Sequence, residues 1–197
     1  MIFNTMKKIT KVMAMLFVAA TMFTTVSCSK DEFDKVDNPT FAALYAYLDR
    51  DADAVKAEMT SLGFEFDDYS STDLMAEKGS ESYYFKFRNG KVYHAEYGYE
   101  ASIPATALVT GKSPIKSAVT DMLDAEKQFR SQSSLTAFSG SIETEDEETY
   151  TSKDAFLSAV NDLDWKNLSE AKSHSTYADV ATIVEFTFNE LSYGVEK

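Results

Sequence analysis

The chain has little of several residue types that define particular protein classes. Its 197 residues include one cysteine, three prolines and seven glycines, and 19 basic residues stand against 32 acidic ones. One cysteine excludes an intrachain disulfide and a multi-thiolate metal site. The few prolines and glycines exclude collagen-like and linker-like chains. The net charge of −13 argues against a nucleic-acid partner, because nucleic-acid binding requires a basic surface.

What is present suits a folded protein. Hydrophobic residues make up 44% of the chain and aromatic residues 13%. This is enough apolar material for a hydrophobic core, and the length is typical of one domain or two small ones.

The N-terminal region has the pattern of a secretory signal. Lys7, Lys8 and Lys11 precede an apolar run over residues 12–26, and no acidic residue occurs before Asp31. A cationic segment followed by a short apolar segment is typical of such signals. The run of about 15 residues is shorter than the ~20 that a membrane-spanning helix needs. An N-terminal membrane anchor or a core helix is the alternative.

The apolar run ends at Thr25-Val26-Ser27-Cys28. These residues resemble the lipobox of bacterial lipoproteins, although Thr25 replaces the usual leucine. The resemblance implies cleavage between Ser27 and Cys28, a diacylglycerol on the Cys28 sulfur and an acylated new N-terminus. We expect no cofactor beyond this lipid. Either Met1 or Met6 is the start of translation.

The next residues are Ser29, Lys30, Asp31 and Glu32. Ser29 is not the aspartate that commonly retains lipoproteins at the inner membrane, and the segment resembles the charged tether of surface-exported lipoproteins. The resemblance implies an outer-membrane protein displayed at the cell surface. Display on the periplasmic side and a plain solvated linker are the alternatives. The expected organisation is a signal peptide over 1–27, a lipidated tether over 28–38 and one domain over 39–197, with 39–110 and 111–197 as alternative halves.

The hydrophobic pattern predicts an α+β fold, with a mostly antiparallel sheet and about three helices packed on one face. Asn89-Gly90 lies between two aromatic, β-favouring runs and predicts a hairpin with a type I′ turn. The pattern loosely resembles small helix-plus-meander modules of secreted inhibitors and PepSY-type proteins. Helices are expected within 39–62, 113–129 and 152–163, the first either continuous or divided into two at Asp49-Arg50-Asp51. Further strands are expected within 135–142, 148–151, 180–188 and 191–195.

A weak internal similarity recurs at an offset of 101 residues. Phe85 and Phe87 correspond to Phe186 and Phe188, and Leu62 corresponds to Leu163. One hypothesis is a duplicated helix–β-meander unit. The alternative is that two unrelated segments share the same helix-then-strand pattern.

No motif for catalysis or metal binding is present. His94 and His174 belong to no metal-binding pair, and the serines form no nucleophile elbow. We expect both histidines to be exposed or half-buried bystanders, His174 in a serine-rich loop. The sequence therefore predicts no catalytic residue, no metal site and no enzyme.

The candidate binding residues lie in the hairpin. Tyr93, Tyr97 and Tyr99 form a stacking platform for a sugar or peptide if they face solvent, and part of the core if they face inward. Arg88 and Asn89, at the hairpin tip, are the candidates for insertion into a protein cleft.

The leading functional hypothesis is a lipid-anchored, non-catalytic cell-envelope protein that recognises a glycan or a protein. The alternative is an inhibitor-like or structural subunit of an envelope complex. A hydrolase that uses paired carboxylates is a third hypothesis, and nothing in the sequence selects its residues.

The lipobox resemblance generates the first prediction. Replacing Cys28 with alanine removes the only acylation site, so the protein should move from the membrane fraction to the soluble fraction. Fractionation followed by immunoblotting measures this, with Ser29→Ala as the matched control that stays in membranes. Retention of the Cys28→Ala variant in membranes would refute lipid anchoring.

Overall fold

The structure is a computed structural model that describes residues 38–130 and 133–197. These residues belong to one compact unit. The predicted signal peptide, the cleavage site, Cys28 and the charged tether residues 29–32 all lie outside the described residues.

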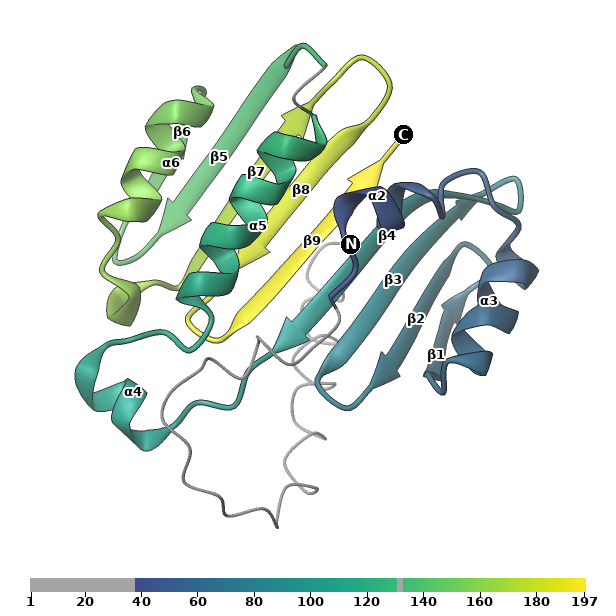
Figure 1. Ribbon diagram of the computed structural model, residues 1–197, viewed down its shortest axis with the longest axis horizontal. Coiled ribbons are helices and arrows are strands. Elements are labelled where there is room, and N and C mark those ends of the chain that lie inside the picture. The colour runs from purple at the N-terminus through teal and green to yellow at the C-terminus, as the bar shows by residue number, and fades with distance from the viewer. Residues whose placement is uncertain (1–37, 131–132) are drawn as a thin grey trace. The chain divides into compact units, whose positions relative to one another are not determined.

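One antiparallel sheet of nine strands dominates the described residues (Figure 1). Its order is β1-β2-β3-β4-β9-β8-β7-β5-β6, so the meander β1 to β4 joins the rest of the sheet where β4 pairs with the last strand, β9. The strands are β1 Glu65–Ser70, β2 Asp73–Lys78, β3 Glu81–Arg88, β4 Lys91–Glu100, β5 Ala137–Glu143, β6 Glu147–Tyr150, β7 Glu170–Thr176, β8 Ala181–Phe186 and β9 Glu190–Glu196.

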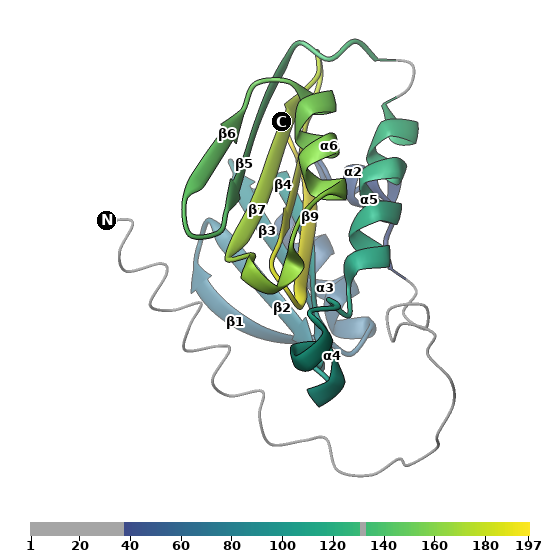
Figure 2. The ribbon, with the colours of Figure 1, turned by 90° about the vertical axis from the view of Figure 1, so that its left-hand side faces the viewer.

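Helices cover one side of this sheet, and the other side is left without any (Figure 2). The longest, α5, buries Val119, Met122 and Leu123 along one stripe, as expected for an amphipathic helix. The helices are α2 Phe41–Tyr45, α3 Ala52–Ser61, α4 Ala105–Thr110, α5 Lys116–Phe129 and α6 Lys153–Asn161, with a 3₁₀ turn, η3, at Trp165–Asn167.

The predicted architecture of about three helices is wrong, because the described residues contain five short ones. The segment 39–62 forms two helices, as in the divided alternative, because Asp49 takes a left-handed φ of 65° and its N–H donates to the carbonyl of Val92. The additional helix α4 buries only Ala107, so it has no amphipathic pattern to predict it from. Residues 172–176 were expected as a serine-rich loop, yet they belong to strand β7, which lies inside the sheet.

The duplicated unit is not complete in the structure. In the first half, α3 precedes a meander of four consecutive strands, β1 to β4, and in the second half α6 precedes a meander of three, β7 to β9. The two meanders meet at β4 and β9, so that β2-β3-β4 and β9-β8-β7 mirror each other in the sheet. The halves differ outside these strands, because β1 follows α3, whereas the β5–β6 hairpin precedes α6 and β5 pairs with β7.

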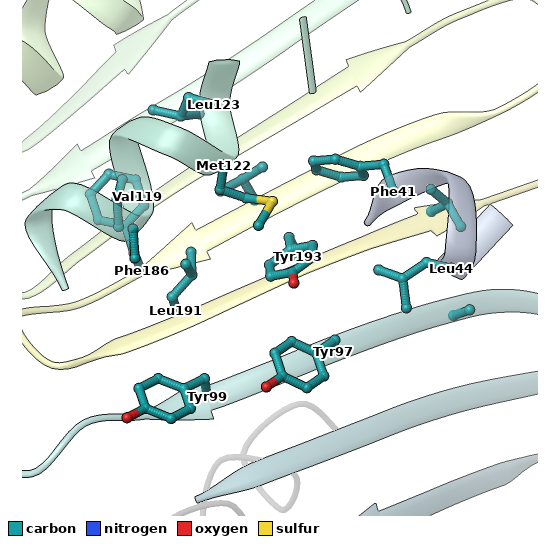
Figure 3. Packing of buried hydrophobic residues seen from close by; sticks show 14 of the residues in the cluster. Phe41, Leu44, Tyr97, Tyr99, Val119, Met122, Leu123, Phe186, Leu191 and Tyr193 are labelled. Carbon is teal, nitrogen blue, oxygen red and sulfur yellow. The ribbon is translucent and has the colours of Figure 1, made fainter. Parts of the chain in front are cut away.

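The core lies between the sheet and the helices, and two buried tyrosines occupy its centre (Figure 3). The rings of Tyr97 and Tyr193 are 5.6 Å apart, and Phe41 from α2 lies 5.4 Å from Tyr193. Each phenol is hydrogen-bonded, as a buried hydroxyl must be: Tyr97 donates to Asn38 Oδ1 at 2.9 Å and Tyr193 to the Pro39 carbonyl at 2.8 Å. These bonds fix the start of the described chain to the central strands.

The hairpin between β3 and β4 has the expected turn. Arg88 pairs with Lys91, and the two residues between them, Asn89 and Gly90, have φ values of 54° and 73°. Positive φ at both central positions defines the type I′ turn.

A pair of glycines at the β4–β9 joint generates the second prediction. A methyl group at Gly194 would lie 2.8 Å from the Ala95 carbonyl, whereas one at Gly98 would meet the Ser82 hydroxyl, which can rotate away. Gly194→Ala should therefore destabilise the fold by roughly 2–3 kcal/mol and the control Gly98→Ala by less than about 1 kcal/mol. Urea unfolding measures both, and equal losses would contradict the close backbone approach.

Candidate functional site

The side of the sheet without helices is the open face (Figure 2). Paired residues of antiparallel strands point to the same side, so the strand register defines its members. Most of them are half-buried, because neighbouring side chains on a sheet cover one another. The central part of the open face comprises Tyr84, Lys86, His94, Glu96, Glu100, Glu143, Glu170, Lys172, Glu185, Glu190, Ser192 and Glu196.

His94 is enclosed between two carboxylates on the open face. Its Nδ1 lies 2.9 Å from Glu196 Oε2 and its Nε2 lies 3.0 Å from Glu96 Oε2. The ring of Tyr84 packs edge-on against the imidazole at 5.8 Å, and the residue is 2% exposed. Only the doubly protonated imidazolium donates to both carboxylates at once.

The pKa of Glu96 reflects this arrangement. Burial alone would raise it, but the hydrogen bond and the charge of His94, together with a hydrogen bond from Ser192, lower the pKa below its ordinary value. The group is therefore a carboxylate near neutral pH.

A histidine bonded in this way is poorly suited to catalysis. A general base needs a free nitrogen within reach of a substrate or nucleophile, and both ring nitrogens of His94 have carboxylate partners. The cluster instead ties the last strand, β9, to β4. Gly194, opposite Glu96, leaves room for that side chain because it carries none of its own.

A row of glutamates crosses the open face at one end of the strands. Glu100 on β4 pairs with Glu190 on β9, and Glu143 on β5 pairs with Glu170 on β7. Glu185 on β8 lies between these pairs and contacts Lys172. Five neighbouring strands thus place one carboxylate each in the same band, which we call the glutamate row.

The crowding of this row raises carboxyl pKa values. The carboxyl groups of Glu170 and Glu185 are hydrogen-bonded to each other. This bond, burial and the negative charge of Glu185 raise the pKa of Glu170 to about 7. Burial and the charges of Glu100 and Glu185 raise the pKa of Glu190. Lys172 is the lysine beside the row, and its single positive charge does not neutralise the five carboxyl groups.

The structure separates the three tyrosines that were candidates for a platform. Tyr97 and Tyr99 are 1% and 7% exposed and lie in the core beneath the helices (Figure 3). Tyr93 lies at a bulge in β4, where the Arg88 guanidinium stacks 4.4 Å from its ring centroid. These residues do not share a solvent-exposed face.

The hairpin tip is bonded to residues at the start of α3. The N–H of Ala52 donates to the Gly90 carbonyl at 3.0 Å, and Lys91 forms an ion pair with Asp51 at 2.8 Å. Arg88 and Asn89 are exposed at the end of this supported turn.

The sequence analysis missed the His94 cluster. His94 and Glu96 are two residues apart on a predicted strand, so their sharing of one face was available from the sequence. Glu196 is 102 residues from His94, and only the pairing of β4 with β9 brings it close. His174, expected in a loop, lies half-buried on the open face in β7.

Within the described parts of the chain, no group of three or more histidine, cysteine, aspartate or glutamate side chains is arranged to hold a metal ion. None of the helices in residues 38–130 and 133–197 is long and apolar enough to cross a membrane. Comparison of the chain with known protein families, with curated proteins and with solved structures finds no match.

The raised pKa of Glu170 generates the third prediction. A carboxyl group with a raised pKa in the folded state contributes stability that is complete below pH 4.5 and is lost as pH rises through about 7. Because Glu170→Gln cannot ionise, it should lose less stability than the parent between pH 5 and pH 8, by roughly 1–2 kcal/mol after solvent screening. Urea unfolding at the two pH values measures the difference.

The control for this experiment is Glu145→Gln, in the exposed turn between β5 and β6. Its pH dependence should parallel that of the parent. If Glu170→Gln also ran parallel to the parent, the shared proton between Glu170 and Glu185 would be refuted.

Proposed function

We propose that the chain is a lipid-anchored, non-catalytic protein of the bacterial cell envelope, displayed at the outer membrane, and that its open face binds a protein partner rich in lysine and arginine. The glutamate row is the observation that carries the proposal. Carboxylates crowded enough to raise each other's pKa are favourably neutralised by cationic groups of a partner. The lipobox resemblance at Cys28 supports the envelope location.

A protein partner fits this surface better than a glycan. Sugar binding commonly uses exposed aromatic rings, and Tyr97 and Tyr99 are buried in the core. On the open face, Tyr84 is engaged with His94 and with Asp73, to which its hydroxyl donates at 3.2 Å. A charged band about 20 Å across five strands offers the broad contact that suits a protein surface.

The hairpin tip supports a second candidate function, that of an inhibitor-like or structural subunit. The type I′ turn, the Arg88–Tyr93 stacking and the bonds to α3 fix the tip in one conformation before any partner arrives. Such preorganisation lowers the entropy that binding costs. A partner of this kind would receive Arg88 in an acidic cleft.

The fourth prediction tests the open face with a fluorescently labelled octalysine peptide. The variant Glu100→Gln/Glu185→Gln/Glu190→Gln removes three charges from the glutamate row, and should bind the peptide about tenfold more weakly than the parent at low salt. Fluorescence anisotropy measures the affinity. The matched control, Asp53→Asn/Asp124→Asn/Asp162→Asn, removes three exposed charges from the helices and changes the net charge equally.

The control variant should retain most of the affinity. Equal losses in both variants would show that only net charge matters and would overturn the open-face proposal. Arg88→Ala should leave octalysine binding unchanged, because the tip is cationic and the peptide binds elsewhere.

A further inference from the structure

The segment between β4 and α5 carries most of the large apolar side chains that are exposed in the described residues. There are five such side chains, and three of them, Ile103, Leu108 and Val109, lie within this one segment. Val109 is 83% exposed and Leu108 57%. Exposed apolar residues are usually scattered singly, so this group, which we call the α4 tip, indicates a contact surface.

The fold holds the segment in place at its base. The N–H of Ala101 donates to the Asn189 carbonyl at 2.8 Å. The Ser113 hydroxyl donates to the Phe188 carbonyl at 2.6 Å. Both ends of the segment are thus bonded to the same turn, which connects β8 with β9. The bonds fix a projection that contributes little to the core, because α4 buries only Ala107.

The helical period directs the tip away from the protein. Successive residues of an α-helix are about 100° apart, so Val109 points about 200° away from the buried Ala107, nearly to the opposite side. Figure 2 shows α4 beyond the end of the sheet, on the side that carries the other helices. The tip therefore faces outward, and the open face lies on the other side of the sheet.

The segment also differs from the rest of the chain in charge. Residues 101–120 contain no acidic residue, although the chain has 32. The surface at the base of α4 has three exposed lysines, Lys112, Lys116 and Lys166, near the carboxylates Asp121 and Asp164. Apolar side chains beside lysines suit a bilayer surface, because the apolar groups enter between the lipids and the lysines meet anionic headgroups. A groove in a protein would accept the apolar residues but would not require an absence of carboxylates.

The described chain begins on the same side of the sheet as α4. Asn38 accepts the hydrogen bond of Tyr97, which lies near the end of β4 from which the α4 segment continues. The ten residues from Cys28 to Asn38 extend at most ~35 Å. A lipid on Cys28 would therefore keep the domain within reach of the bilayer surface.

We propose that the α4 tip inserts into the surface of the bilayer that holds the lipid of Cys28. Leu108 and Val109 enter the boundary between headgroups and acyl chains, and Lys112 and Lys116 lie at the level of the headgroups. This inference rests on the lipid anchor of the proposed function. A single point of attachment leaves the domain free to rotate, and the second contact restricts that rotation.

A fluorescent probe tests insertion in the lipidated protein, purified from membranes and reconstituted into vesicles of phosphatidylethanolamine and phosphatidylglycerol. The lipid blocks the sulfur of Cys28, so Val109→Cys provides the single thiol for nitrobenzoxadiazole. Its emission should shift to shorter wavelength. Quenching by lipids with nitroxides at different depths should place the probe ~5–10 Å into the headgroup–acyl boundary.

Leu135→Cys provides the control position for the probe. Leu135 is 41% exposed and precedes β5, whose first residue lies at the opposite end of the sheet from α4 (Figure 1). A probe there should stay in water. Equal quenching at the two positions would contradict a contact made by the α4 tip.

A second pair of variants measures what the apolar side chains contribute. In the protein labelled at position 109, Ile103→Gln/Leu108→Gln should reduce quenching and lower the partition into the bilayer by about tenfold or more. The matched control, Leu62→Gln/Leu135→Gln, removes two exposed leucines elsewhere and should leave quenching unchanged. All four side chains are at least 40% exposed, so the variants should keep the parent melting temperature.

Flotation of the vesicles separates this proposal from the lipid anchor on which it rests. Protein that floats while the probe at position 109 stays in water overturns insertion and leaves the anchor standing. Protein that does not float overturns the anchor, and insertion with it. A probe that is shielded in whole envelope membranes but not in pure lipid vesicles would show that the tip binds a protein, which overturns the bilayer contact.

Discussion

The pairing of β4 with β9 is the constraint on which the rest of the structure depends. It joins strands that are about a hundred residues apart and connects the β1–β4 meander to the second half of the sheet. On the helix side it places Tyr97 beside Tyr193, and on the open face it places His94 opposite Glu196. Because the two faces alternate along each strand, a one-residue slip of β9 against β4 would move Tyr193 to the open face and Glu196 to the helix side. The aromatic core and the histidine cluster thus select the same register.

Buried charge recurs on the helix side, where it fixes helices instead of strands. Glu126 of α5 is 1% exposed; it accepts a hydrogen bond from the Thr182 hydroxyl at 2.5 Å and lies 2.7 Å from Lys153 Nζ of α6. A buried ion pair contributes little net stability, because desolvation offsets the attraction, but removal of one partner is costly. Such a pair favours one arrangement of α5, α6 and β8 over others. On both faces, a buried titratable side chain with close carboxylate, hydroxyl or amine partners thus links neighbouring elements.

Local patterns in the sequence predicted the parts that depend on local physics. The Asn89-Gly90 turn and the amphipathic helix α5 follow from positive φ and from a 3.6-residue period. Strand β7 escaped prediction because its exposed side is polar and its buried side holds small residues, Ala171, Ser173 and Ser175, so no hydrophobic alternation marks it. The His94 cluster and the glutamate row were not predicted for a different reason. Each depends on which strands are neighbours, and strand order has no local signature.

The position of Asn38 bears on whether an anchor at Cys28 leaves the open face accessible to a partner. The described part begins at Asn38, which accepts the hydrogen bond of Tyr97 on the helix side of the sheet. Asn38 therefore lies on the side of the sheet opposite the glutamate row. The ten residues from Cys28 to Asn38 extend at most ~35 Å, so a lipid at Cys28 would keep the domain near the membrane. Since the attachment point and the open face lie on opposite sides of the sheet, anchoring at Cys28 is compatible with a partner on the open face. An acidic face directed toward anionic lipid would be repelled, and repulsion would favour the same orientation.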